Sequence, residues 1–126
     1  MRKKILIIDD EEDFCFFTKK NLENTKKFDV IFENNPLNGV KVAIQNKPDI
    51  ILLDIIMPEL DGSEVAFRLL NDPSTKDIPI LFLTCLADEK DLSNNKGSIG
   101  GRPFLAKPCE VNQLVKTIQE ILERKV

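Results

Sequence analysis

The sequence predicts an α/β domain in which a parallel β-sheet is covered by helices on both faces. Short apolar runs alternate five times with longer helix-like segments, which is typical of a parallel sheet with right-handed crossovers. The run over residues 50–53 is apolar throughout, as expected of a strand buried on both faces. With 126 residues, 42% hydrophobic and 31% charged, the chain suits a single domain over 1–126. The alternation itself leaves the strand order open.

The first half of the chain begins with an apolar strand over residues 4–8, which ends at five consecutive acids, residues 9–13. Because acids stabilise the positive N-terminal end of a helix dipole, we expect a helix from Glu12 to about Asn24. Phe28–Glu33 alternates apolar and polar residues and is predicted to be an edge strand. A short helix over residues 37–45 follows it.

The second half repeats the alternation around the buried central strand. Pro58 must lie outside that strand, because proline cannot donate to a ladder. The helix over residues 87–95 is the weakest prediction, since it is polar, whereas the last helix has one continuous apolar stripe. The remaining elements are the strand 50–53, the helix 58–71, the strand 79–83, the helix 87–95, the strand 103–106 and the helix 110–124.

Composition excludes several classes of function. The net charge is −3 and no basic run is present, which argues against nucleic-acid binding. No apolar run reaches the ~18 residues of a membrane span, and the N-terminal run is too short for a signal peptide; we therefore expect a cytoplasmic protein without membrane association. Cys15, Cys85 and Cys109 form no CxxC pair and the chain has no histidine, so a disulfide framework, a zinc site and histidine catalysis are not expected.

Polar residues of distinct kinds end four of the predicted strands: Asp9 with Asp10, then Asp54, Thr84 and Lys107. Taken singly, these residues suit a helix cap, a strand-end hydroxyl or a solvated lysine. In a parallel sheet, however, the four ends meet at one edge. Three carboxylates there repel one another unless a cation is bound, and Mg²⁺ prefers such oxygen ligands. With an ammonium and a hydroxyl to bind an anion, the set suits phosphoryl transfer, with Asp54 as the nucleophile.

These strand ends resemble those of the receiver domains of two-component response regulators. The resemblance covers essentially the whole chain and is carried by residues 7–11, 53–62, Ile80–Thr84 and 104–108, above all by Asp-x-x-Met-Pro-x-x-Asp-Gly from Asp54. It implies a flavodoxin-like, doubly wound, five-stranded parallel sheet in the order 2-1-3-4-5 with five helices.

The resemblance also implies a role for each acid at this edge. Asp54 would be the phosphoacceptor. Asp10 would bind Mg²⁺ directly, Asp9 largely through water, and the backbone carbonyl of Ile56 would be a further ligand. The phosphoryl donor would be a sensor histidine kinase or a histidine phosphotransfer protein.

Three further residues complete the implied site. Lys107 would contact the phosphoryl group, Thr84 would be the switch hydroxyl, and Phe104 would be the switch aromatic. Three features depart from the usual family pattern. Cys85 replaces a smaller residue after the threonine, residues 99–104 replace the usual Gly-Ala-x-x-(Tyr/Phe)-Leu entry to the last strand, and Phe104 lacks the hydroxyl of the commoner tyrosine.

The function expected from these observations is a phosphorylation-controlled signalling module that catalyses its own phosphorylation and dephosphorylation and acts on a downstream protein. It is either a stand-alone regulator or a receiver cut from a longer protein. A Mg²⁺-dependent phosphohydrolase with an aspartyl nucleophile is the main alternative, but the Asp-x-Asp of such enzymes is absent after Asp54. A flavin-binding domain is a third option; its phosphate loop is replaced by an acid run.

Four local expectations follow. The Lys107–Pro108 bond is expected to be cis, and residues 87–101 to be the least stable segment. At least one aromatic residue of 14–17 should be exposed and should dock the phosphoryl donor. Ile56 and Leu86 should form an apolar gate against water, which prolongs the phosphorylated state.

Overall fold

A sheet of five parallel strands, extended by one short antiparallel strand, forms the centre of the molecule. The computed structural model describes residues 2–54, 62–84, 98–99, 102–107 and 110–124. The strand order is β2-β1-β3-β4-β6-β5. The strands are β1 (Lys3–Ile8), β2 (Phe28–Glu33), β3 (Ile50–Asp54), β4 (Ile80–Thr84), β5 (Ser98–Ile99) and β6 (Arg102–Ala106).

The predicted fold class is confirmed. The five expected strands are parallel and adjacent in the expected order, with β6 as the fifth. The two-residue strand β5, antiparallel to β6, was not expected. Four helices are described: α1 (Glu12–Asn24), α2 (Pro36–Asn46), α3 (Gly62–Leu70) and α5 (Val111–Arg124). The helix expected over residues 87–95 lies outside the described residues.

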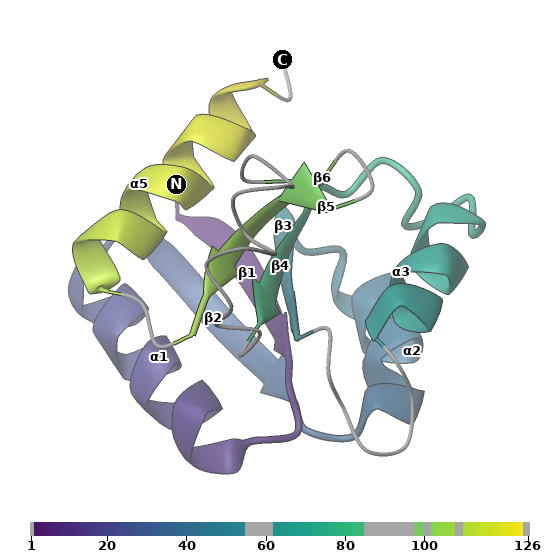
Figure 1. Ribbon diagram of the computed structural model, residues 1–126, viewed down its shortest axis with the longest axis horizontal. Helices are drawn as coiled ribbons and strands as arrows, with labels where there is room; N and C mark the ends of the chain where they lie inside the picture. The colour runs from purple at the N-terminus through teal and green to yellow at the C-terminus, as the bar shows by residue number, and fades with distance from the viewer. Residues whose placement is uncertain (1, 55–61, 85–97, 100–101, 108–109, 125–126) are drawn as a thin grey trace.

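Helices cover both faces of the sheet, with α1 and α5 on one side and α2 and α3 on the other (Figure 1). Each helix buries an apolar stripe; in α5 the stripe contains Leu114, Ile118 and Ile121, as its pattern predicts. Helix α2 begins where the Asn35 side chain accepts a hydrogen bond from the Leu37 N–H at 3.0 Å, and it ends at Lys47 in the left-handed region with φ 47°. None of the described helices is long and apolar enough to cross a membrane.

Two apolar layers, one on each face of the sheet, make up the core. Alternate residues of β1 supply them: Ile5 and Ile7 pack in the layer under α1 and α5, whereas Leu6 and Ile8 pack in the layer under α2 and α3. The strand β3 is buried along its whole length. Because each fully buried Leu or Ile side chain contributes roughly 1.5–3 kcal/mol, these central strands hold their carboxyl ends in fixed positions.

Candidate phosphoryl-transfer site

The register of the parallel strands brings the predicted polar residues to one edge of the sheet. Ile8 pairs with Leu53, so that Asp9 and Asp54 follow side by side. At the other end of the site Thr84 pairs with Ala106, and Lys107 follows directly. The convergence predicted from the strand ends is therefore present for Asp9, Asp54 and Lys107.

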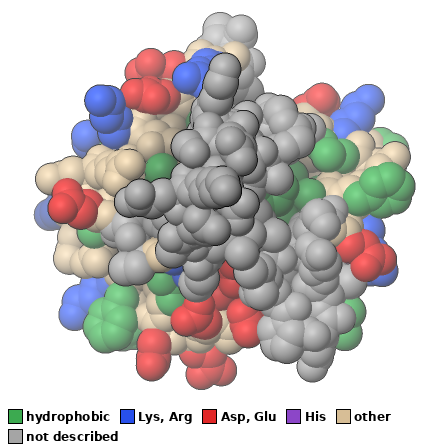
Figure 2. Space-filling view, in the orientation of Figure 1, with side chains coloured by type: hydrophobic (Ala, Val, Ile, Leu, Met, Phe, Trp, Pro, Cys, Tyr) green, Lys and Arg blue, Asp and Glu red, His purple; other side chains and the backbone are tan. Residues whose placement is uncertain are grey.

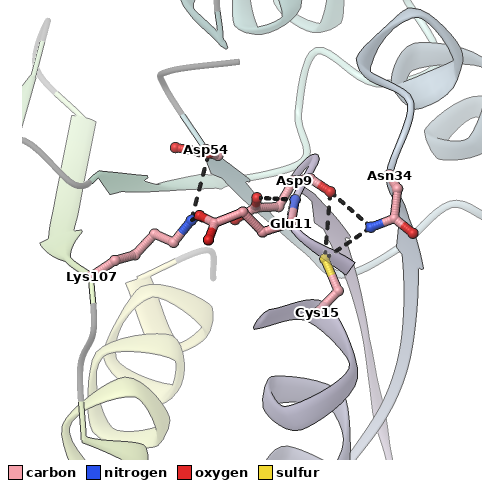
Figure 3. A network of polar contacts seen from close by, with 6 residues as sticks. All are labelled: Asp9, Glu11, Cys15, Asn34, Asp54 and Lys107. Atoms are coloured by element: carbon pink, nitrogen blue, oxygen red, sulfur yellow. Dashed lines mark hydrogen bonds and ion pairs between the residues drawn. The ribbon is translucent and has the colours of Figure 1, made fainter. Parts of the chain in front are cut away.

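Lys107 lies at the centre of this edge, and its side chain is buried. Its Nζ donates to Asp9 Oδ2 at 2.7 Å and to Glu11 Oε1 at 2.6 Å, and lies 3.6 Å from Asp54 Oδ2 (Figure 3). The ring of Phe14 lies below the ammonium, with its centroid 4.3 Å from Nζ. Burial lowers the pKa of Lys107, but the hydrogen bonds to Asp9 and Glu11 outweigh it, so that the pKa is raised. The ammonium is therefore charged at neutral pH.

Asp9 is fully buried, and burial raises the pKa of its carboxyl despite the opposing hydrogen bonds from Lys107 and the Glu11 backbone. The Glu11 N–H donates to Asp9 Oδ1 at 2.9 Å, and Lys107 takes the other oxygen. Both carboxylate oxygens are thus engaged by donors, which is what keeps a buried acid in place.

The chemistry of the donor set fits a hard divalent cation. Asp9, Glu11 and Asp54 each offer a carboxylate oxygen, and these oxygens lie within 4.8 Å of one another. Oxygen ligands at this spacing suit Mg²⁺. Asp10, expected to bind the ion directly, is half-buried at the start of the loop and is not a member of this group in the described part of the chain. Its role stays a prediction, and Glu11 is an acid that the sequence reasoning did not single out.

The other predicted residues are placed as follows. Asp54 is the last residue of β3 and is 2% exposed. Thr84 is the last residue of β4, and its side chain lies outside the described part. Phe104 is buried in the apolar layer that also contains Phe82. Four expectations fall wholly or mostly outside the described residues: the Ile56 carbonyl as a ligand, the Cys85 and Leu86 side chains, the cis peptide bond to Pro108, and the low stability of residues 87–101, of which only 98–99 are described.

A second polar network connects the loop after β1 to the end of β2 and to α1. The Asn34 side chain, directly after β2, donates to the Asp9 backbone oxygen at 2.9 Å and to Cys15 Sγ at 3.5 Å. The Cys15 thiol donates to the same oxygen at 3.5 Å (Figure 3). Sequence reasoning missed Asn34, because an asparagine after an edge strand is an ordinary turn signal. Glu11 could have been found only as one member of the acid run.

Helix α1 presents aromatic side chains next to the acidic edge. Phe16 is 56% and Phe17 59% exposed, with their rings in edge-to-face contact at 5.7 Å. The expectation that at least one aromatic residue of 14–17 is exposed is confirmed. Cys15, by contrast, is fully buried, and Phe14 faces Lys107. Figure 2 shows acidic side chains gathered at the lower edge, the side on which α1 begins in Figure 1.

Comparisons with known proteins agree with this geometry. Residues 5–119 match the response regulator receiver domain family. The chain is 35% identical over 119 residues to protein PilH of Pseudomonas aeruginosa, covering 94% of this chain and 97% of PilH. It is 36% identical to the DNA-binding transcriptional regulator RpaA of Synechocystis, covering 96% of this chain and 49% of RpaA. The structure of a response regulator from Chloroflexus aurantiacus superposes with a TM-score of 0.83 at 27% identity, covering 98% of this chain and 99% of that one.

Proposed function

Because this chain belongs to the response regulator receiver domain family, we propose that it accepts a phosphoryl group on Asp54 in a Mg²⁺-dependent reaction. Receiver domains are signalling modules that accept phosphate from histidine kinases. The chain spans nearly the whole of PilH but about half of RpaA. The observation that carries the proposal is the buried Lys107 ammonium held among Asp9, Glu11 and Asp54.

The charges at the edge explain why a metal is required. Three carboxylates face one ammonium, so an incoming phosphoryl group meets an excess of negative charge. A bound Mg²⁺ would neutralise that excess and polarise the phosphoryl oxygens. Asp9 and Asp54 would hold the ion, with Asp10 and the carbonyl of Ile56 as the further ligands that the family pattern implies. The Asp54 carboxylate is buried at the end of β3. The position of this strand in the sheet would therefore determine the direction from which the carboxylate attacks the phosphorus atom.

Lys107 would supply the fixed positive charge for the transferred group. Its ammonium is charged and buried, so its attraction for a phosphoryl oxygen is stronger than that of a solvated lysine. Two of the three N–H donors of Lys107 bind Asp9 and Glu11, and we propose that the ammonium exchanges part of this contact for one with the phosphoryl group on Asp54. We propose that Thr84, at the end of β4, and Phe104, in β6, respond to this change in the contacts of Lys107.

The partners we propose are a histidine kinase or histidine phosphotransfer protein as donor and a downstream protein as target, both in the cytoplasm. The exposed Phe16 and Phe17 beside the acidic edge support donor docking on α1. A phosphohydrolase is the weaker candidate, because no second acid stands two residues after Asp54 to protonate a leaving group.

Intact-mass measurement after incubation with a small acyl phosphate tests the proposal. The wild type should gain one phosphoryl group with Mg²⁺ and none with a chelator, and Asp54→Asn should gain none under either condition. Asp49→Asn is a matched control at the opposite end of β3 and should be labelled like the wild type. Equal labelling of wild type and Asp54→Asn would remove Asp54 from its role.

A further inference from the structure

The backbone of Asp9 is held by groups from outside its own strand. Its N–H donates to the Glu33 carbonyl at 3.2 Å. Its carbonyl accepts from Asn34 Nδ2 at 2.9 Å and from Cys15 Sγ at 3.5 Å. Glu33 and Asn34 are the end of β2 and the residue after it. The N–H and the carbonyl of Asp9 are therefore both hydrogen-bonded to residues at the end of β2.

These hydrogen bonds to the Asp9 backbone lie just beyond the last paired residues of β1 and β3. The pairing of β1 with β3 ends at Ile8 and Leu53, one residue before the two aspartates. Beyond that point the Asp9, Glu11 and Asp54 carboxylates lie close together around Lys107, and their mutual repulsion favours movement of the loop after β1 away from β3. The hydrogen bonds to the Asp9 N–H and carbonyl oppose that movement, and the groups that make them are uncharged.

The chemistry of the Asn34 amide suits this task. Its NH₂ group has two hydrogens; Asp9 O and Cys15 Sγ are its two acceptors, so that both hydrogens are used. The Cys15 thiol is buried and donates to the Asp9 carbonyl at 3.5 Å. Three side-chain and backbone groups thus satisfy one another in a closed, neutral arrangement.

We propose that Asn34, with Cys15 as its partner, is a positioning residue that fixes the acidic loop for binding the divalent cation. The inference rests on the proposed function and deepens it, since it assigns a role to residues outside the ligand set. Groups that orient metal ligands typically contribute 10- to 100-fold to metal affinity. Loss of the Asn34 amide is therefore expected to weaken Mg²⁺ binding about tenfold.

The neighbouring Asn35 provides a matched control. Its side chain caps α2 by accepting from the Leu37 N–H, and it makes none of the contacts to Asp9 that Asn34 makes. Asn35→Ala removes the same chemical group one residue away and destabilises the fold through α2. A merely structural effect at Asn34 would resemble that of Asn35.

The test is isothermal titration of Mg²⁺ into wild type, Asn34→Ala, the nearly isosteric Asn34→Asp and Asn35→Ala, with the melting temperature of each. We expect both Asn34 variants to bind about tenfold more weakly and Asn35→Ala to bind within about twofold of wild type, even if it melts lower. In the metal-free protein, the Glu11 amide, which donates to Asp9 Oδ1, should exchange faster in the Asn34 variants only.

Mg²⁺ affinity and Glu11 exchange that are unchanged in Asn34→Asp would overturn the inference; this variant decides if Asn34→Ala does not fold. An equal loss in Asn34→Asp and Asn35→Ala would overturn it too, because the effect would then be one of stability. A wild type that binds no Mg²⁺ and gains no phosphoryl group would instead refute the proposed function, and this inference with it.

Discussion

Replacing Lys107 by methionine is the most informative change at this site. Methionine keeps the apolar stem and removes the ammonium, which is buried between the Asp9, Glu11 and Asp54 carboxylates. Deleting one partner of a buried ion pair costs about 3–5 kcal/mol. The lower end applies here, because the Glu11 side chain is 55% exposed and regains hydration. We expect a loss of about 3 kcal/mol in the free energy of unfolding at pH 7.

The effect should depend on pH in a defined direction. The pKa of Asp9 is already raised by burial above its ordinary value of 3.8, and removal of the Lys107 ammonium raises it further. A carboxyl whose folded pKa is raised binds more protons in the folded than in the unfolded state, so stability increases as pH falls through that pKa. The difference between wild type and Lys107→Met should therefore shrink between pH 7 and pH 5.

Urea unfolding followed by far-ultraviolet circular dichroism measures this loss, since the chain has no Trp or Tyr for fluorescence. With a slope of about 2 kcal/mol per molar urea, the midpoint should fall by about 1.5 M. Arg68→Met is the control: its ion pair with Glu64 at 3.3 Å is exposed, and its loss should cost less than about 1 kcal/mol. A loss for Lys107→Met as small as that of the control, or a gap that widens on acidification, would refute the reasoning.

Two further substitutions test the surroundings of the site by the same assay. In Gly39→Ala the new Cβ would lie 2.8 Å from Ile8 Cδ1 and 3.1 Å from its Cγ2. Ile8 is fully buried in the apolar layer under α2 and α3 and has little room to move away, so overpacking of about 1–3 kcal/mol outweighs a helix-propensity gain of about 1 kcal/mol. We therefore expect net destabilisation, and a more stable variant would contradict this expectation. Phe14→Leu removes the ring 4.3 Å from Lys107 Nζ and should cost about 1 kcal/mol. In the Lys107→Met background that cost should largely vanish; an undiminished cost would mean that the ring acts only by packing.

The fold could be predicted from the sequence because its central strands are buried on both faces. The β3 segment is wholly apolar up to Asp54, and such a run is typical of a strand in a parallel sheet that helices cover on both faces. The two-residue pairing of β5 with β6 could not be predicted, because Ser98 and Ile99 have no periodicity to detect and lie beside two glycines. Pattern methods need at least four residues to distinguish a strand.

The site was predicted as far as the strand ends determine it. Asp9, Asp54 and Lys107 lie within a residue of strand ends whose register is set by the core. Which acid of a run of five turns inward is decided instead by the path of the loop, and here Glu11 reaches Lys107. The Asn34 contact depends on that same path, since it binds a backbone oxygen rather than a side chain. A backbone contact of this kind leaves no pattern in the sequence.

The Lys107 ammonium supplies part of the positive charge that a bound cation would supply to the three carboxylates. Lys107 neutralises one of three converging carboxylates, which leaves a negative excess that matches a divalent cation. In the function that we propose, a bound cation would supply the counter-charge of Asp9 and Asp54, and the Lys107 ammonium would then be available to bind an anionic group. The proposed metal binding and phosphorylation would then be coupled through the buried Lys107 side chain. Glu11, whose side chain is 55% exposed, could follow Lys107 or release it at little cost in solvation.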